Sequence, residues 1–422
     1  MRISTSQFYT ASLAGMLNQQ ATIGNLSQQL ATGNRLTNPA DYPVDSAQVV
    51  GLAGQLNRLA SYQQNGQNAQ NALQLESSTL QSAGTLLNQV RSLALQMNNA
   101  TVSSQDLNNA ASAMGGYLQQ LLQYANTQDG QGNYLFAGSK NQTQPFSLLP
   151  NGQVQYSGDG AQNQVTIGSS LQTAVSDPGN AVFMDIPAGN GSYTVAASGA
   201  NTGGAVAGPG SVANASLAQQ VLVVDQTQYQ ISFSGSAASG GTQTYTVISG
   251  TGGAMSASGV VASGTFTPGM SITVPSSGGT AVLNVPVQGT PAAGDTFTVA
   301  AAGKQSLFTI FQNLQQAFSM NASAPGTNAQ RAQAIANAIS GLDQSQTTLL
   351  NTQAVIGTRL QQVQAVQNMN SNLTLQLQTQ QSKLTNINYP QVIAAYQQSL
   401  TALQASEAAY AKVQGLSLFQ YI

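Results

Sequence analysis

The sequence contains no Cys, no His and no Trp, and only 5% of its 422 residues are charged. Without Cys the chain has no disulfide framework and none of the usual thiolate metal sites. Without His it has no Ser-His-Asp triad, no His-ligated zinc ion and no imidazole base near neutral pH. These absences argue against most hydrolases and metalloenzymes. We therefore expect no enzyme activity, no cofactor and no metal site.

Charge is scarce in both signs. The chain has 10 Lys and Arg against 12 Asp and Glu, which gives a net charge of −2, whereas an average protein has about 25% charged residues. Its polar surface must therefore consist of Gln, Asn, Ser and Thr. A net charge this small gives no general attraction to nucleic acid or to an anionic membrane. An uncharged polar surface suits subunits that are packed at high local density, and it equally suits an acidic or saline environment.

The first ten residues, Met1–Thr10, lack the apolar core of a secretory signal peptide. No apolar run approaches the roughly 20 residues of a membrane span, so we expect no membrane insertion. The sequence is compatible with a cytoplasmic protein and with export that needs no cleaved signal.

Both ends of the chain have helical composition. From about Val44 to Asn126 the sequence is rich in Leu, Ala and Gln and has no Pro. We predict a first helix of about 55 residues, a break at Thr101–Asp106 with an N-cap at Ser103 or Ser104, and a shorter second helix. Spacings of three and four residues indicate a coiled-coil seam. That seam consists of Ala69, Leu73, Glu76, Leu80, Ala83, Leu87, Val90, Ala94 and Met97.

The C-terminal third and the first forty residues carry similar stripes. One stripe comprises Val363, Val366, Asn370, Leu373, Leu377, Gln380, Leu384 and Ile387; after Pro390 another comprises Ile393, Tyr396, Leu400, Leu403, Glu407 and Tyr410. The N-terminal stripe comprises Tyr9, Leu13, Met16, Gln20, Ile23 and Leu30. Each terminal helix needs an apolar partner. We predict that the two pair and bring the chain ends together.

The middle of the chain has a different composition. Between Asn141 and Gly303 there is no Lys or Arg, and Gly, Ser, Thr and Ala dominate. Short alternating runs between turn residues predict an antiparallel β domain. The runs are Gln153–Tyr156, Gln164–Ile167, Ser192–Ala196, Gln220–Val224, Tyr229–Phe233, Thr244–Ile248, Ser271–Val274, Ala281–Val287 and Thr296–Val299. Ala197–Ser211 has the composition of a linker, but the regular runs on either side favour a folded insert.

Few residues are candidates for chemistry. Asp129–Asn133 lacks the carboxylates of a calcium loop and is better interpreted as a turn. Lys304 follows Gly303 but is not preceded by a complete phosphate loop. The two glutamates, Glu76 and Glu407, both lie on apolar helical stripes. A general-acid pair would join opposite ends of the sequence, so we favour a role in helix register or an ion pair with Arg at a subunit contact.

Several stretches resemble the family of flagellar hook-associated protein 3, within the flagellin superfamily. Similar to that family are the start Met1-Arg-Ile-Ser-Thr5, Leu30–Pro43, Asn126–Gly138 with its Tyr-Leu-Phe-Ala-Gly ending, and Gln414–Gln420. Tyr42 stands where the family usually has a second acidic residue. Tyr156–Gly160 and Gly289–Phe297 are similar to pieces of the middle domains of hook-associated proteins. Val90–Leu95 and Thr101–Leu107 look flagellin-like, whereas residues 186–288 show no resemblance.

The resemblance implies a structural protein at the junction of hook and filament. It implies export in an unfolded state through the flagellar type III apparatus, after contact with a cytoplasmic chaperone. A ring of copies would then lie between the first hook-associated protein and the first flagellin layer, outside the cell. The terminal helices would form the inner core, the long helices the next shell, and the β domain would project outward.

The predicted fold class is therefore α+β and multidomain: a long antiparallel helical bundle or coiled coil with an inserted antiparallel β domain. We expect three parts: 1–43 with 388–422, 44–140 with 304–387, and 141–303. The terminal helices are short and Gln-interrupted, and such a pair is marginal alone in water, so we expect assembly to be coupled to their folding. The assembly contacts that we predict are Leu13, Leu17, Leu400, Leu403, Leu416, Leu418 and Phe419.

Two further classes stay open at this stage. A flagellin-like filament subunit would share the helical ends. A secreted adhesin would use the β insert to bind a ligand, with the helices as a stalk. An enzyme in the insert is disfavoured, because its acidic residues are only Asp159, Asp177, Asp185 and Asp225, with Asp295 near its end.

Overall fold

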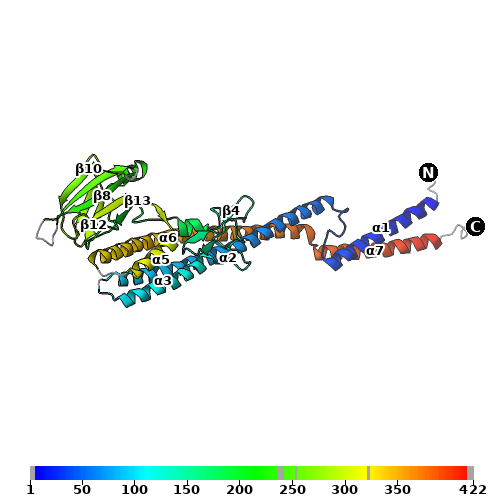
Figure 1. Cartoon of the computed structure of the whole chain (residues 1–422). Coiled ribbons are helices and arrows are strands. Elements are labelled where there is room, and N and C mark those ends of the chain that lie inside the picture. Colours follow the sequence, from blue (N-terminus) through cyan, green and yellow to red (C-terminus); the bar gives the residue numbers. More distant parts are fainter. Residues whose placement is uncertain (1–4, 100, 236–241, 252–253, 321–323, 416–422) are drawn as a thin grey trace, which may run out of the picture. The chain divides into compact units, whose positions relative to one another are not determined.

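The protein is described from a computed structural model, which describes residues 5–99, 101–235, 242–251, 254–320 and 324–415. The chain divides into two compact units. Unit 1 comprises Met1–Gly66, Ile167–Leu171 and Ala365–Ile422, and unit 2 comprises Gln67–Thr166 and Gln172–Gln364. The expected class, an α+β chain with long terminal helices and an inserted antiparallel β domain, is confirmed (Figure 1).

The α-helices follow the apolar stripes of both ends. They are α1 (Thr5–Thr32), α2 (Pro43–Met97), α3 (Ser104–Ala125), α4 (Ala215–Ala218), α5 (Leu307–Ser319), α6 (Pro325–Thr385) and α7 (Tyr389–Gly415). Two π-helical turns are η1 (Asn180–Met184) and η2 (Gln219–Val224). Across the described ranges, no helix has an apolar stretch of the length that a lipid bilayer requires.

The long first helix and the break after it are confirmed. Helix α2 has 55 residues. Ser103 is the N-cap of α3, and its hydroxyl oxygen accepts a hydrogen bond from the Asp106 backbone N–H at 3.1 Å. The same hydroxyl donates to the Asp106 carboxylate at 2.7 Å. Because this cap satisfies a free N–H of the first turn, it fixes where the second helix begins.

In unit 2 the predicted coiled-coil seam of α2 is buried from Ala69 to Ala94, and its last residue, Met97, is half-buried. The buried seam residues are Ala69, Leu73, Glu76, Leu80, Ala83, Leu87, Val90 and Ala94. On the same helix Arg91 forms an ion pair with Asp343 of α6 at 2.7 Å. Helix α3 packs on α5, whose buried face is formed by Leu307, Phe308, Ile310, Phe311, Leu314, Ala317 and Phe318.

In unit 1 the stripe of α6 is only partly buried. Leu377 is buried with Leu52 and Leu59 of α2. Asn370, the polar residue that interrupts the stripe, donates a hydrogen bond from Nδ2 to the Ile167 carbonyl at 3.0 Å. Leu373 is 40% exposed, so its predicted place in the seam is wrong. The loop Ile167–Leu171 belongs to unit 1 and gives Asn370 its buried partner.

The strands of the insert lie in unit 2. They are β1 (Phe146–Leu148), β2 (Val154–Tyr156), β3 (Gln164–Thr166), β4 (Gln172–Ala174), β5 (Ile186–Pro187), β6 (Tyr193–Ala197), β7 (Val206–Ala207), β8 (Thr227–Ser234), β9 (Thr244–Thr251), β10 (Ala254–Thr265), β11 (Ser271–Pro275), β12 (Ala281–Gln288), β13 (Thr296–Ala301) and β14 (Lys304–Gln305). A five-stranded sheet has the order β10-β9-β8-β13-β6, and a three-stranded sheet has the order β11-β12-β7. All of these pairs are antiparallel.

The two larger sheets share one core. Phe233, Phe266 and Phe297 pack edge to face, with ring centroids 5.0 and 6.0 Å from Phe233. Tyr193 and Tyr229 are also fully buried there. Alternation along each strand places one face in this core and the other toward solvent.

Eight of the nine predicted β runs overlap strands, and Gln220–Val224 is wrong because it forms η2. Asn214 caps the preceding helix α4 by accepting a hydrogen bond from the Leu217 N–H at 3.1 Å. The helical segment that this cap starts buries Ala218 and Leu222 in the β-domain core. A short apolar run of this length fits a strand and a buried helical turn equally well.

Ala197–Ser211 is folded rather than a linker. It contains β7, and the Asn201 Nδ2 donates to the Thr296 carbonyl at 2.9 Å. The buried Asp295 carboxylate accepts from the backbone N–H groups of Thr202 at 2.9 Å and Ala292 at 2.8 Å. Asp295 is thus a structural acceptor that holds this segment in place.

Two of the sequence motifs close one aromatic cluster. Tyr156 donates from its hydroxyl to the carbonyl oxygens of Phe136 at 3.0 Å and Asp159 at 2.7 Å. Gly138 has φ +69, and a Cβ there would lie 2.2 Å from Oδ1 of Asp159, so only glycine fits. Phe136 and Phe146 both pack against Phe183, at 5.1 and 5.7 Å between ring centroids. Asn126–Gly138 and Tyr156–Gly160 therefore form one structural element.

Candidate assembly surface

Helices α1 and α7 pair in unit 1, as the stripes predict. They run antiparallel: Tyr9 packs edge to face on Tyr410 at 5.5 Å between ring centroids, and Gln19 Nε2 donates to the Ser399 carbonyl at 3.3 Å. The half-buried face of α1 comprises Tyr9, Ser12, Met16, Gln19, Ile23, Leu26 and Leu30. The two ends of the described chain therefore lie side by side (Figure 1).

A two-stranded backbone contact anchors the pair where α1 ends and α7 begins. Gly33, at φ +67, donates its N–H to the Gln29 carbonyl at 2.8 Å and closes α1. The Ile387 N–H donates to the Gly33 carbonyl at 3.2 Å, and the Arg35 N–H donates to the Thr385 carbonyl at 2.7 Å. A Cβ at Gly33 would lie 2.9 Å from the Tyr389 hydroxyl, so this position requires glycine.

The side chain of Arg35 ties the same corner to α2 and α6. Its guanidinium pairs with Asp45 at 2.5 Å and donates to the Leu384 carbonyl at 3.1 and 3.3 Å. It also lies over the Tyr42 ring, 5.1 Å from the centroid. Tyr42 therefore gives Arg35 a cation–π contact at the position where the resemblance implied an acidic residue.

The predicted assembly residues fall into three groups. Leu13 and Leu17 are 50% and 57% exposed and lie off the face of α1 that meets α7. Leu400 and Leu403 are half-buried on α7. Leu416, Leu418 and Phe419 lie outside the described residues. The structure thus does not bring Leu13 and Leu17 into the core of the pair, and their role in assembly stays a prediction.

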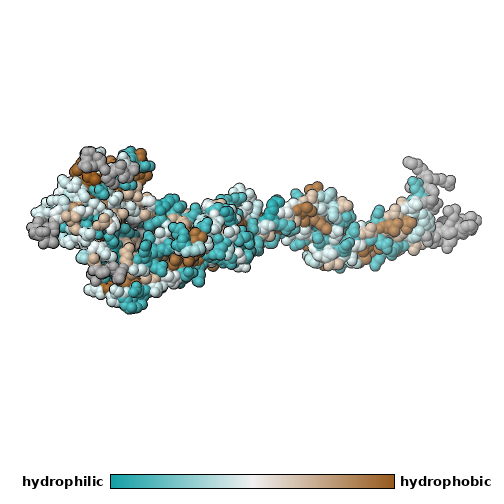
Figure 2. Space-filling view, viewed as in Figure 1, coloured by the Kyte–Doolittle hydropathy of each residue, from teal (hydrophilic) through white to brown (hydrophobic). Residues whose placement is uncertain are grey.

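More apolar side chains are exposed on unit 1 than the stripes indicated. Figure 2 shows apolar surface over the α1–α7 pair. The exposed apolar residues that the stripe analysis missed are Val44, Val50, Met369, Leu375 and Tyr389. Met369, Leu375 and Tyr389 lie one or two positions from stripe residues, whereas Val44 and Val50 precede the predicted seam of α2. Such residues serve no core in the single chain.

Unit 2 contains one buried cluster of ionisable residues, formed by Glu76, Asp177 and Arg359. Glu76 of α2 accepts the Asp177 backbone N–H on Oε1 at 2.9 Å, and its Oε2 has no hydrogen-bond partner in the described part of the chain. Arg359 of α6 holds the Asp177 carboxylate with two hydrogen bonds, at 2.9 and 3.0 Å. The expected ion pair of Glu76 with Arg at a subunit contact is wrong, because Glu76 is fully buried within unit 2 and the nearby Arg359 pairs with Asp177 instead.

Burial, and then the Asp177 charge, raise the pKa of Glu76 to about 8. A raised pKa in a cleft suggests a general acid, but Glu76 is fully buried. A neighbouring pocket of roughly 520 Å³ is lined by Asp177 and Arg359 and not by Glu76. Glu76 therefore has no access to a ligand in that pocket. The cluster has a structural role, because Glu76 of α2 and Arg359 of α6 both bind Asp177 and so hold its loop against the two helices.

The other chemical candidates also have structural roles. The Asp129 carboxylate accepts backbone N–H groups of its own turn, from Gln131 at 2.8 Å and Asn133 at 2.9 Å. Lys304 lies in β14 and pairs with Asp185 at 3.1 Å. Across the residues that the structure describes, no three His, Cys, Asp or Glu side chains lie close enough to hold a metal ion.

Comparisons with known proteins agree on one group of relatives. A family model described as the bacterial flagellin N-terminal helical region matches residues 3–141. Flagellar hook-associated protein 3 of Escherichia coli K12 is 25% identical over 421 residues, covering 100% of this chain and 99% of that protein. The crystal structure of flagellar hook-associated protein 3 from Legionella pneumophila is similar with a TM-score of 0.70 and 30% identity, over 79% of this chain and 98% of that one. FlgL of Xanthomonas campestris gives a TM-score of 0.66 and 25% identity, over 78% of this chain and 99% of that one.

Proposed function

We propose, from the premise that this chain belongs to the flagellar hook-associated protein 3 family, that it is an extracellular structural subunit of the bacterial flagellum that joins hook and filament. One observation carries this function beyond the family likeness. The terminal helices pair with each other, yet leave Leu13 and Leu17 half exposed. A subunit of a closed array has neighbours that can cover such residues.

The proposed partners follow from that role. Copies of the chain would form a ring, with the first hook-associated protein on one side and flagellin on the other. Before assembly the chain would meet a flagellar export chaperone and pass unfolded through the type III export apparatus. The absence of Cys supports this route, because a chain without Cys cannot form disulfide cross-links while it is unfolded. We propose no catalytic role, in keeping with relatives that are structural proteins.

We also propose that three parts of the chain have separate positions in the flagellum. Residues 1–43 with 388–422 would form the inner core, residues 44–140 with 304–387 the next shell, and residues 141–303 the outer domain. The separate aromatic core of the two larger sheets supports an independent outer domain.

Immunogold electron microscopy of detached flagella tests the function. With a tag inserted at Ser277–Gly278, in the exposed turn between β11 and β12, the gold label is expected as one cluster per flagellum, where the hook meets the filament. Cells expressing an untagged chain are the control. Gold along the whole filament would instead identify a filament subunit, and gold on cells that lack flagella would favour an adhesin.

Coupled folding predicts fast hydrogen exchange at both ends of the monomer. Backbone amides of α1 and α7 are expected to exchange within seconds, because only one face of each helix is covered and opening the pair costs little. Amides of α2 between Ala69 and Ala94, which line the buried seam, should exchange far more slowly and serve as the internal reference. Mass spectrometry of the exchanged monomer measures both. Equally slow exchange in α1 and α7 would mean that the ends fold before assembly.

A further inference from the structure

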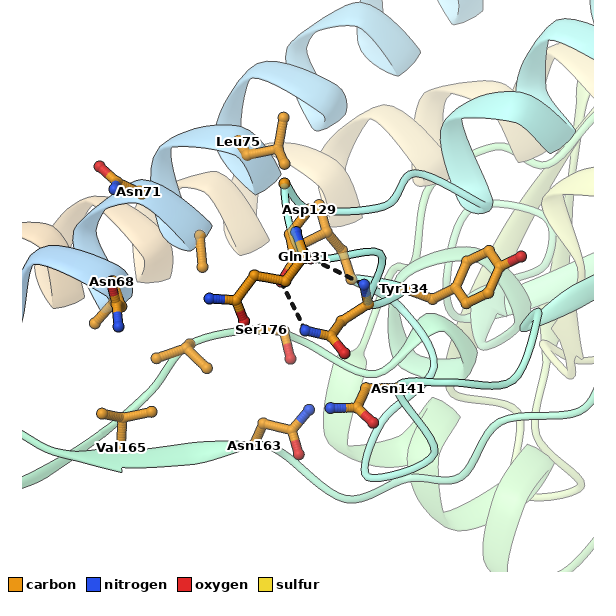
Figure 3. Close-up of a pocket in the computed structure, with 16 residues that line it drawn as sticks. Asn68, Asn71, Leu75, Asp129, Gln131, Tyr134, Asn141, Asn163, Val165 and Ser176 are labelled. Atoms are coloured by element: carbon orange, nitrogen blue, oxygen red, sulfur yellow. Dashed lines mark hydrogen bonds between the residues drawn. The ribbon is translucent and has the colours of Figure 1, made fainter. Parts of the chain in front are cut away.

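A second pocket, of roughly 600 Å³, lies beside α2 in unit 2, but its lining selects no class of ligand (Figure 3). The Asp129 carboxylate accepts hydrogen bonds from the backbone N–H groups of Gln131 and Asn133, at 2.8 and 2.9 Å, so its own loop satisfies it. The rest of the lining is a mixture of amide and apolar side chains. The strand edges of the β domain are more specific, because the unpaired N–H and C=O groups of a strand are complementary to another extended backbone.

Two edges of the β domain are protected by α6. Strand β6 is the last strand of the five-stranded sheet, and its Val195 carbonyl accepts a hydrogen bond from Asn337 Nδ2 of α6 at 3.3 Å. Strand β7 is the last strand of the three-stranded sheet. There the Gln333 amide accepts from the Ala207 N–H at 2.8 Å and donates to the Ala207 carbonyl at 2.6 Å. Side-chain amides of α6 thus take the place of a further strand at both edges.

Strand β10 forms the opposite edge of the five-stranded sheet, beside β9 (Figure 1). The Phe266 N–H donates to the Gln243 carbonyl at 2.8 Å, so Phe266 faces the β9 side. Because the backbone groups of an antiparallel strand alternate between its two sides, Gly264 also faces β9, and the N–H and C=O groups of Ser263 and Thr265 point outward. Within the described part of the chain, neither Ser263 nor Thr265 has a hydrogen bond outside the pairing with β9.

Strand β10 lacks the features that usually protect an edge strand, since it has no charged residue and no Pro. Strand β11, at the edge of the other large sheet, has only five residues and ends at Pro275. The bulge of β10 lies between Met255 and Ala262. It leaves Ala262–Thr265 in regular register with β9, so this short stretch has a straight, unprotected edge.

Two rows of hydroxyl side chains cross the sheet and end at this edge. The rows are Ser232, Thr246 and Ser263, and Ser234, Thr244 and Thr265, each on β8, β9 and β10 in turn. The Ser234 and Thr244 hydroxyls are 2.7 Å apart, so neighbours within a row form hydrogen bonds. Such cross-strand pairs of Ser and Thr stabilise antiparallel sheets. Ser263 and Thr265 are exposed, and each row therefore ends in a hydroxyl that faces solvent.

We propose that the β10 edge binds the same edge of a second copy of this chain, antiparallel to it and with the two-fold axis at Gly264. In this register Ser263 of each copy lies opposite Thr265 of the other, and their outward N–H and C=O groups form hydrogen bonds between the copies. Each hydroxyl row also continues into a row of the second copy. The edge specifies this partner, because an identical strand supplies both the unpaired backbone and the hydroxyl groups at matching positions.

This contact goes beyond the proposed function. Neighbours in a ring meet through two different surfaces, whereas a two-fold contact uses the same surface twice. The β10 contact therefore joins copies that are not neighbours in one ring. Attachment of filaments to hooks does not depend on it.

Disulfide cross-linking of the purified chain tests the register, because the wild-type chain has no Cys that could compete. Ser263→Cys and Thr265→Cys chains are mixed and oxidised with copper phenanthroline. Opposite residues of this kind lie about 5.5 Å apart at Cα, within the range that a disulfide spans, whereas two equivalent residues lie diagonally, roughly 7–8 Å apart. The mixture is therefore expected to give at least fivefold more covalent dimer than either variant alone.

The control for the cross-link is Ser277→Cys, in the exposed turn between β11 and β12, mixed with Thr265→Cys. This mixture measures the yield of random collisions and should match the single variants. Equal yields in all mixtures, or the highest yield in a single-variant sample, would overturn the proposed pairing.

Sedimentation of the full-length chain gives an independent readout. The wild type is expected to sediment as a concentration-dependent mixture of monomer and dimer. Ser263→Pro removes an outward N–H, which an edge strand tolerates, and is expected to raise the dimer Kd at least tenfold while the monomer stays folded. Ser277→Pro, in the exposed turn, should behave as the wild type does.

The same variants separate this proposal from the proposed function. Ser263→Pro is expected to leave the number of cells with attached filaments unchanged. If Ser263→Pro dimerises as the wild type does, the pairing of β10 edges fails and the proposed function stands. If the folded variant instead loses attached filaments, the β10 edge is a contact within the ring, and the two-fold pairing is wrong.

Discussion

Deletion of Gln414–Ile422 is expected to abolish the attachment of filaments to hooks. This segment carries Leu416, Leu418 and Phe419, the apolar residues that we expect to be buried when copies pack. None of its residues belongs to unit 2, so the seam of α2 and the β-domain core should be unaffected. Electron microscopy of cells that express only the shortened chain should show hooks without filaments. Circular dichroism of the purified chain should show that most of the structure is retained.

A full-length variant tests whether assembly depends on exposed apolar side chains without removing any part of the chain. Leu13→Gln with Leu17→Gln removes two exposed apolar side chains from α1 and leaves its half-buried face intact. We expect a reduction of tenfold or more in attached filaments, with unchanged monomer stability. Leu350→Gln is the matched control, because Leu350 is 53% exposed on α6 in unit 2. Attached filaments at wild-type frequency in cells with the shortened chain would refute the role given to the C-terminal segment.

The helices could be predicted closely because their signals are local. The seam from Ala69 to Ala94 has spacings of three and four residues, so its pattern repeats every seven residues. The Ser103–Asp106 pair is a recognisable helix N-cap. The terminal pairing followed from the same periodicity. The actual face of α1 differs from the predicted one, because it contains Ser12 and Gln19 and leaves Leu13 and Gln20 out. An apolar stripe shows what can be buried, but a marginal two-helix pair does not bury all of it.

Contacts between distant parts of the sequence could not be predicted. Asp177 and Arg359 are separated by 182 residues, and nothing near either one indicates the other. The same holds for Asn370, whose stripe-breaking amide is explained by the Ile167 carbonyl. The apolar residues of Gln220–Val224 fit a strand and a helical turn equally well, so the sequence alone predicts a strand there. In the folded chain this segment is a helical turn, because in that form it packs Leu222 against the sheets. The two motifs Asn126–Gly138 and Tyr156–Gly160 could be recognised from the sequence alone. Each contains a glycine that the fold requires, because a Cβ at Gly138 or Gly158 would clash with neighbouring atoms.

The second buried acid in the Asp177 cluster has a consequence for stability. Two carboxylates and one guanidinium meet there. Asp177 accepts hydrogen bonds from the Arg359 guanidinium and, at 2.7 Å, from Gln162 Nε2. Glu76 has no cation of its own. Burial, together with the neighbouring Asp177, therefore favours its neutral form and raises its pKa from 4.5 to about 8. At neutral pH the folded chain keeps a proton on Glu76 that the unfolded chain has lost.

Glu76→Gln is expected to stabilise the protein increasingly as the pH rises. Because the folded state binds the extra proton, stability from this group is fully present below about pH 4.5 and is lost as the pH rises toward about 8. The wild-type free energy of unfolding should thus fall by about 3 kcal/mol more than that of the variant between about pH 5.5 and about pH 8. Gln keeps the carbonyl that accepts the Asp177 N–H and has no charge to bury. Scanning calorimetry of the monomer over this range measures the difference.

Glu407→Gln is the matched control, since Glu407 is the other glutamate of the chain and lies exposed on α7. Its melting temperature should follow the wild-type curve at every pH. The test compares how the free energy of unfolding changes with pH, and not its absolute value. At low pH the absolute values differ little, because the Gln amide and the protonated carboxyl each leave one polar group without a partner. If Glu76→Gln and wild type change in parallel with pH, Glu76 is charged in the folded protein. The cluster would then be a network of three charges, in which Arg359 neutralises both acids.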